Sequence, residues 1–169
     1  DLLDAFAPRM QADPNLHLLW VGDGYWSERL LTRVEELGLT DQVHTPGLVP
    51  PEMIPDWIRA MDVVVHPSYR EGLPRAVVQG LLSAKPVVAY ALDGAPEVCI
   101  DGETGILIQP GDHAALADAI ERLRGDAELR TRLGAEGRRR CRGPFDRKTM
   151  VRELDEIYRR VIAESEAKA

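Results

Sequence analysis

The chain has 169 residues, of which 44% are hydrophobic and 29% are charged, and its formal net charge at neutral pH is −7. These values are typical of one globular domain, and no apolar run approaches the ~20 residues that a membrane-spanning helix needs. The negative charge argues against a nucleic-acid partner. Two isolated cysteines, Cys99 and Cys141, indicate a cytoplasmic protein with reduced thiols and no metal site.

The first predicted elements lead to a glycine-rich turn. Residues 1–7 already have helical spacing, residues 16–21 are predicted to form a buried strand, and residues 26–37 a helix that ends at Gly38. Gly22-Asp23-Gly24 stands between this strand and this helix, where backbone N–H groups could approach a phosphate. Taken alone, the two glycines are equally explained by a tight turn that requires positive φ.

The next predicted strand covers residues 42–45. Pro46-Gly47-Leu48-Val49-Pro50 follows as a loop, and residues 51–61 follow as a helix. An ordinary Pro/Gly connection and a ligand-binding loop both fit this composition, so the residues themselves leave the two open.

The central part of the chain is predicted to form a parallel βαβ unit. A β-branched run at residues 63–65 is followed by a loop, a helix that ends before Lys85-Pro86, and a buried strand at residues 87–90. Ligands of open α/β sheets bind at the carboxyl ends of the strands, so residues 68–74 would lie at the mouth of a site. Glu71 is the acid in this loop, although taken alone it is more simply a solvated carboxylate beside Arg70.

The remaining elements carry less chemistry. Residues 106–108 are predicted to form a strand, and Asp112 is predicted to cap a helix over residues 114–124. The basic run at residues 138–142 is most simply a solvated helix face. Residues 147–164 have one apolar stripe at helical spacing, and His66, the histidine nearest the predicted site, is expected to be structural.

Several motifs occur in a fixed order: Glu71-Gly72-x-Pro74, Gln79, Ala84-Lys85-Pro86-Val87-Val88, Gly94-x-Pro96-Glu97 and Asp101-Gly102-x-Thr104-Gly105. Together they resemble the retaining, nucleotide-sugar-dependent glycosyltransferases of the GT-B fold, in the group 1 or family 4 type. The resemblance extends from residue 1 to about residue 158. It implies an α/β fold with a Rossmann-like parallel sheet flanked by helices, and it identifies residues 1–169 as the C-terminal, donor-binding domain.

The resemblance also implies roles for individual residues. Glu71 would bind the donor-sugar hydroxyls as the catalytic-site acid, and Gln79 stands where the family has a second Glu that binds the ribose. A neutral hydrogen bond contributes ~0.5–1.5 kcal/mol and a charged one ~1.5–3 kcal/mol, so Gln79 weakens nucleotide binding without excluding it. The other residues implied to bind the donor are Gly22, Asp23, Gly24, Leu48, Val49, Ser68, Gly72, Leu73, Pro74 and Gly94, with Leu48 and Val49 contacting the base through main-chain atoms.

The implied reaction transfers a hexosyl group from a nucleoside diphosphate sugar to an acceptor hydroxyl with retention of configuration, without a metal or other cofactor. In the family, a first strand with an Arg and a Lys that bind the diphosphate precedes residue 1, and an N-terminal acceptor lobe precedes that strand. We therefore expect this chain alone to bind nucleotide weakly and to catalyse nothing. The terminal helix packs on the other lobe in the family, so its stripe is expected to be exposed or to self-associate here. Because many relatives act on lipid-linked acceptors, the resemblance is also compatible with peripheral association of this protein with the inner face of the membrane.

Two alternatives remain open. A non-catalytic nucleotide-sugar-binding or regulatory module is favoured by Gln79 at the position of the second Glu. A dinucleotide-dependent dehydrogenase or epimerase is suggested only by Gly22-x-Gly24, and it ranks last because Ser27 replaces the third glycine of that motif.

Overall fold

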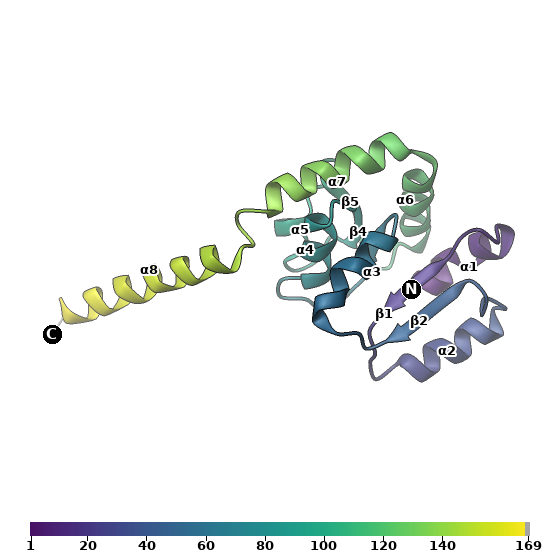
Figure 1. Ribbon diagram of the computed structural model, residues 1–169, viewed down its shortest axis with the longest axis horizontal. Coiled ribbons are helices and arrows are strands. Elements are labelled where there is room, and N and C mark those ends of the chain that lie inside the picture. Colours follow the sequence, from purple (N-terminus) through teal and green to yellow (C-terminus); the bar gives the residue numbers. More distant parts are fainter. Residues whose placement is uncertain (168–169) are drawn as a thin grey trace.

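The computed structural model describes residues 1–167 and has strands that alternate with helices along the chain (Figure 1). The elements are α1 (Leu2–Ala12), β1 (Leu18–Val21), α2 (Ser27–Glu36), β2 (Val43–Gly47), the 3-10 helix η1 (Pro51–Met53), α3 (Ile54–Ala60), β3 (Val64–His66), α4 (Arg75–Leu82), β4 (Val87–Tyr90), α5 (Ala95–Val98), β5 (Gly105–Ile108), α6 (His113–Gly125), α7 (Ala127–Cys141) and α8 (Arg147–Glu166). This is the α/β fold with parallel strands that the sequence predicted.

The strands form two parallel sheets instead of one. β1 pairs with β2, and a second sheet has the order β3-β4-β5. The predicted Rossmann-like parallel sheet flanked by helices is thus present, divided into two sheets within the part of the chain that the structure describes. No described strand lies between the two sheets to join their hydrogen bonds, although one hydrophobic cluster contains side chains from both, including Val43 of β2 and Val88 of β4.

β4 is the centre of the larger sheet and is buried on both faces. Val88 and Tyr90 belong to the cluster beneath α1 and α6, whereas Val87 and Ala89 belong to the cluster beneath α4 and α5. Successive side chains of a strand point to opposite faces, so an uninterrupted apolar run is what a sheet covered by helices on both faces requires. The sequence-based prediction of a buried strand at residues 87–90 is confirmed.

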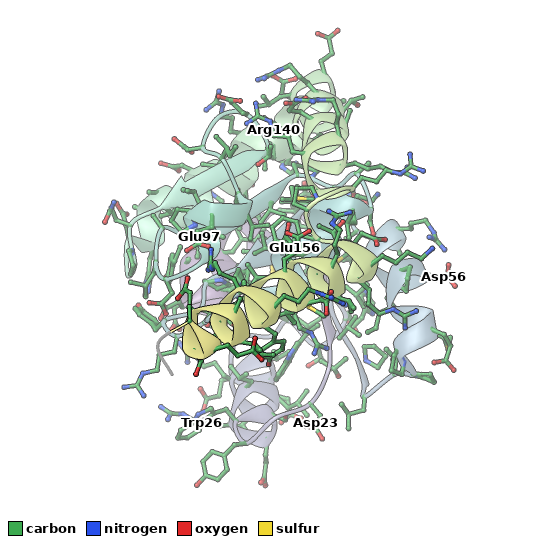
Figure 2. The ribbon with its side chains drawn as sticks, turned by 90° about the vertical axis from the view of Figure 1, so that its left-hand side faces the viewer. Asp23, Trp26, Asp56, Glu97, Arg140 and Glu156 are labelled. Carbon is green, nitrogen blue, oxygen red and sulfur yellow. The ribbon has the colours of Figure 1, made fainter. Side chains whose placement is uncertain are left out.

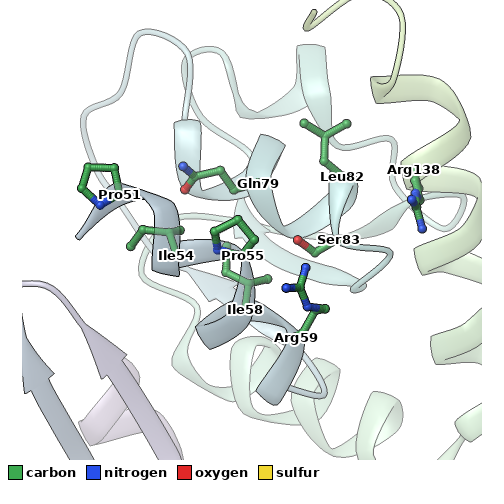
Figure 3. A pocket seen from close by; sticks show the side chains of 9 residues that line it. All are labelled: Pro51, Ile54, Pro55, Ile58, Arg59, Gln79, Leu82, Ser83 and Arg138. Carbon is green, nitrogen blue, oxygen red and sulfur yellow. The ribbon is translucent and has the colours of Figure 1, made fainter. Parts of the chain in front are cut away.

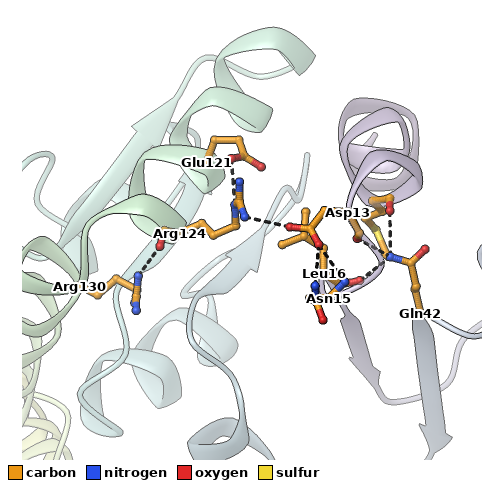
Figure 4. Close-up of polar contacts among 8 residues, drawn as sticks. Asp13, Asn15, Leu16, Gln42, Glu121, Arg124 and Arg130 are labelled. Carbon is orange, nitrogen blue, oxygen red and sulfur yellow. Dashed lines mark hydrogen bonds and ion pairs between the residues drawn. The ribbon is translucent and has the colours of Figure 1, made fainter.

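A polar junction ties the α1–β1 turn to the neighbouring elements (Figure 4). The side-chain amide of Gln42 donates to the carbonyls of Met10, Asp13 and Leu16 at 2.8–3.0 Å. Arg124 of α6 reaches Asp13 Oδ2 at 3.1 Å. Buried carbonyl groups need hydrogen-bond donors, and the Gln42 amide supplies them to the three carbonyls of this turn. The ion pair of Asp13 with Arg124 connects the same turn to α6.

The predicted boundaries agree with the structure within a few residues, with one informative exception. Pro46 and Gly47 were expected in a loop, but β2 continues through them, and the N–H of Gly22 donates to the carbonyl of Gly47 at 2.9 Å. Gly47 has a φ of 71°, a conformation open to glycine, and it ends the strand there. The loop that follows therefore begins at Leu48.

The last helix, α8, extends away from the remainder of the fold (Figure 1). None of its residues is buried, and the expected apolar stripe is exposed, with Val151, Leu154, Ile157, Tyr158, Val161 and Ile162 each 44–65% accessible. Figure 2 shows this helix in front of the other elements, with Glu156 on it. Its N-terminus is stabilised by Asp146, whose side chain accepts the N–H of Lys148 as an N-cap. No helix within residues 1–167 is long and apolar enough to cross a bilayer.

Candidate functional site

The loop that follows β3 carries Glu71 and is anchored to the loop that follows β4. The backbone N–H of Glu71 donates to Asp93 Oδ2 at 2.9 Å. Asp93 has a φ of 50°, a left-handed conformation that costs free energy for any residue except glycine. The carboxyl ends of two adjacent parallel strands thus bring these loops together, as the sequence predicted for the mouth of a site.

A close backbone contact holds the same two loops. A Cβ atom at Gly94 would lie 2.0 Å from the carbonyl oxygen of Gly72, far inside van der Waals contact. Only glycine allows this approach, and it seats residues 71–73 against the start of α5. Gly72 and Gly94, both predicted site residues, are therefore adjacent, and Leu73 beside them is 45% exposed.

His66 ends β3 directly beneath Glu71. Its Nε2 lies 3.3 Å from Glu71 Oε1, and the side chains are 19% and 36% exposed. This Nε2 is buried and has no hydrogen-bond partner of good geometry in the described part of the chain. The proximity of His66 to the site was expected, but its contact with Glu71 was not, because residue spacing gives no distance between a strand end and a loop.

Ser68 and Pro74 shape this loop from its two ends. The Ser68 hydroxyl donates to the carbonyl of Arg70 at 3.2 Å and lies 3.4 Å from the N–H of Arg70, so it closes a turn. Pro74 is the N-cap residue of α4 and provides no side-chain hydrogen bond. The first N–H groups of α4 therefore have no side-chain cap, and the aligned peptide dipoles favour an anion there.

A cluster that sequence reasoning missed lies beside this loop. Asp1 Oδ2 accepts hydrogen bonds from Tyr69 and Tyr90 at 2.6 and 2.7 Å, and Asp1 Oδ1 lies 3.3 Å from His113 Nε2. Desolvation, together with the neighbouring Tyr69, raises the pKa of the Tyr90 phenol. The available signal was Tyr90 at the end of a buried strand, since a buried hydroxyl needs a partner.

The glycine-rich turn after β1 is closed on itself. The N–H of Gly24 donates to Asp23 Oδ1 at 2.7 Å and lies 2.8 Å from Ser27 Oγ, which itself donates to Asp23 Oδ1 at 2.5 Å. The bond from Ser27, followed by that from Gly24, lowers the pKa of the Asp23 carboxyl below its usual value. Gly22 has a φ of 123°, as a tight turn requires. In this conformation the N–H of Gly24 is already used within the turn.

The loop after β2 presents two candidate base contacts. Leu48 is 80% exposed and Val49 is intermediate, and both stand directly after the hydrogen-bonded end of β2. The two residues thus lie at the surface beside the turn that contains Gly22, whose N–H donates to the carbonyl of Gly47.

Gln79 points from α4 into a hollow of about 320 Å³, which it shares with Pro51 and Ile54 (Figure 3). The other lining residues are Pro55, Ile58, Arg59, Leu82, Ser83 and Arg138. Pro51 follows the Leu48–Val49 loop by two residues, so the structure brings Gln79 beside the segment that the sequence associated with the base. No residue of the Glu71 loop lines this hollow.

Two arginines of the basic run at the end of α7, Arg139 and Arg140, are paired with acids. Arg139 and Arg140 both bond Glu136, and Arg140 also pairs with Glu103 in the turn before β5. The bonds from Arg139 and then Arg140 lower the pKa of Glu136 to about 2. Across residues 1–167 there is no group of three His, Cys, Asp or Glu side chains that could hold a metal ion.

Comparison with known proteins places this arrangement in a family. A family model for the glycosyl transferases group 1 matches residues 1–140. The capsular polysaccharide biosynthesis glycosyltransferase CapM of Staphylococcus aureus is 30% identical over 99% of this chain and 44% of its own length. The chain thus spans about two fifths of the length of the curated relatives it matches.

Solved structures agree in fold. HepE of Anabaena, in complex with UDP-glucose, is 29% identical with a TM-score of 0.84 over 93% of this chain and 43% of that one. The C-terminal domain of the group 1 glycosyltransferase LpcC of Francisella tularensis is 27% identical with a TM-score of 0.72, over 80% of this chain and 73% of that domain. This chain therefore belongs to the group 1 glycosyltransferases, and its Rossmann-like fold is that of the C-terminal domain of the GT-B enzymes.

Proposed function

We propose that this chain is the donor-binding lobe of a retaining glycosyltransferase that transfers a hexosyl group from a nucleoside diphosphate sugar to an acceptor hydroxyl. The observation that carries the proposal is Glu71 itself, whose backbone N–H is anchored by Asp93 at the carboxyl end of β3, in a chain of this family. Glu71 is 36% exposed, so its oxygens can accept hydroxyl donors from a ligand.

The nucleoside would lie between the Leu48–Val49 loop and Gln79. The hollow beside Gln79 supports this because Pro51 and Ile54 supply apolar surface for a base while the Gln79 amide can bond a ribose hydroxyl. HepE, which matches most of this chain, was solved with UDP-glucose. UDP is therefore the first nucleotide to test.

The diphosphate would lie at the N-terminus of α4, between the sugar and the nucleoside. The absence of a side-chain cap within this described helix leaves its first N–H groups for an anion, whereas the turn at residues 22–24 already uses the N–H of Gly24 and carries the charge of Asp23. Backbone dipoles and positive side chains would replace a divalent metal, so we propose no metal cofactor.

The whole protein would include a further strand and an acceptor lobe before residue 1. The two separate sheets support the strand: Asp1 bonds Tyr69 and Tyr90, so α1 begins where β3 and β4 end, and a strand that leads into it would run parallel to them. The exposed stripe of α8 supports the acceptor lobe as its intramolecular partner. We propose a cytoplasmic enzyme that can contact the inner face of the membrane through a lipid-linked acceptor.

A non-catalytic nucleotide-sugar-binding module is the second candidate. Gln79 favours it, since an amide binds a ribose less strongly than the carboxylate that the family has at this position. The two candidates share the binding site and differ only in turnover by the full-length protein.

Calorimetric titration of the chain with UDP and with UDP-glucose tests the shared part. We expect the sugar to add affinity, and Glu71→Ala to remove about 10- to 150-fold of affinity for UDP-glucose while affinity for UDP changes less than about twofold. Glu35→Ala on the exposed face of α2 is the matched control. Equal affinity of the wild type and Glu71→Ala for UDP-glucose would refute the role of Glu71, and binding without turnover by the full-length protein would favour the second candidate.

A further inference from the structure

We propose that His66 is a positioning residue that fixes the carboxylate of Glu71 for the donor sugar. This inference rests on the proposed function and adds a role in ligand binding to the structural role that the sequence indicated for His66. His66, at the end of β3, would thus contribute to sugar recognition by orienting Glu71, which itself contacts the ligand.

The location of His66 makes it a rigid support. It is the last residue of β3, in register with Ala89 of the fully buried central strand β4. Its ring is four-fifths covered, so it cannot easily leave the position in which Nε2 faces Glu71 Oε1 at 3.3 Å. Glu71, by contrast, stands in a loop and is about one third exposed.

The hydrogen-bonding needs of the two side chains are complementary. A buried imidazole N–H without a hydrogen-bond acceptor is unfavourable. Within residues 1–167, Glu71 is the only acidic side chain within ion-pair distance of His66 Nε2, which is buried and makes no hydrogen bond. With the neutral ring protonated at Nε2, a small rotation of the Glu71 side chain completes an Nε2–H···Oε1 hydrogen bond. One oxygen of the carboxylate is then tethered, and Oε2 together with the second lone pair of Oε1 remains for sugar hydroxyls.

Asp93 would therefore hold the backbone of Glu71, and His66 would hold its carboxylate. Asp93 accepts the backbone N–H and fixes where the residue lies, and His66 would fix which way the carboxylate points. A site that bonds hydroxyls selectively needs such preorganisation, because a carboxylate free to rotate must be ordered when the ligand binds.

The test uses two substitutions that differ only in the presence of a donor. His66→Gln can place an amide N–H near the position of Nε2, whereas His66→Phe keeps a ring of similar size without a donor. In calorimetric titrations we expect His66→Phe to lose about fivefold or more of the affinity for UDP-glucose while affinity for UDP stays within about twofold, and His66→Gln to recover most of that loss. Equal losses for both ligands, or no loss for either, would overturn the inference.

A measurement without ligand separates this inference from the proposed function and remains decisive if His66→Phe does not fold. The ring ¹⁵N and ¹H resonances of His66 in the free protein should show a proton on Nε2 and should shift in Glu71→Gln but not in Glu35→Gln. A His66 ring that does not respond to Glu71→Gln overturns the inference. Failure of the wild type to bind any nucleotide sugar would instead overturn the proposed function, and the spectra would still decide whether His66 holds Glu71.

Discussion

Gly94→Ala should damage both the stability and the sugar recognition of this domain. The reason is steric and not conformational, because Gly94 has a φ of −79°, which alanine adopts without strain. The added Cβ would lie 2.0 Å from Gly72 O, so the two loops must separate by about 1–1.5 Å to reach ordinary contact. Overpacking of this kind costs about 1–3 kcal/mol, and the same displacement moves the segment that carries Glu71.

The assay is thermal unfolding followed by circular dichroism, with Gly72→Ala as the matched control. A cost of about 1–3 kcal/mol lowers the Tm of a domain of this size by roughly 2–12 °C. A Cβ at Gly72 meets nothing within 4 Å, so that variant should keep its Tm within about 2 °C. If Gly94→Ala unfolds at the temperature of Gly72→Ala, the contact between the loops is not as close as described and the reasoning fails.

Two further substitutions test the helices. Asp112→Ala removes the side chain that accepts the N–H of Ala115 at the start of α6, so it should destabilise the domain by about 0.5–2 kcal/mol in urea unfolding, and an unchanged midpoint would contradict that role. Glu136→Gln probes a carboxyl whose pKa is lowered from 4.5 to about 2, so its stabilising effect is present above pH 4.5 and is lost as the pH falls through 2. The Tm difference between wild type and Glu136→Gln should therefore be constant above pH 5 and vanish near pH 2, and a difference that persists there would refute the assignment.

The sequence was a good guide wherever structure is set by local pattern. The run at residues 87–90 predicted a strand buried on both faces, and Asp112 predicted a helix start, because periodicity and capping depend on residues close in the chain. The same pattern predicted that Glu71 lies at the carboxyl edge of a parallel sheet, where the structure has it. The family motifs then supplied the fold.

What the sequence could not provide were contacts between segments distant in the chain. The approach of Gly94 to Gly72, the bond from Glu71 to Asp93 and the proximity of His66 to Glu71 all depend on how two loops meet. The division of the strands into two sheets is of the same kind, since hydrogen-bond pairing is decided by neighbours in space. Motifs can nominate residues for a site, but only packing shows which of them support one another.

The short connection between α7 and α8 means that a small rotation there would produce a large displacement at the far end of α8. Phe145 packs against the cluster that contains Cys141, and α8 begins two residues later, after Asp146. A helix of 20 residues is about 30 Å long, so a rotation of about 10° at Asp146 displaces its far end by about 5 Å. A partner bound along the apolar stripe would thus change its position relative to the rest of the domain while the packing at Phe145 and along the stripe stays intact. The backbone torsion angles of Asp146 would then set the distance between that partner and the rest of the domain.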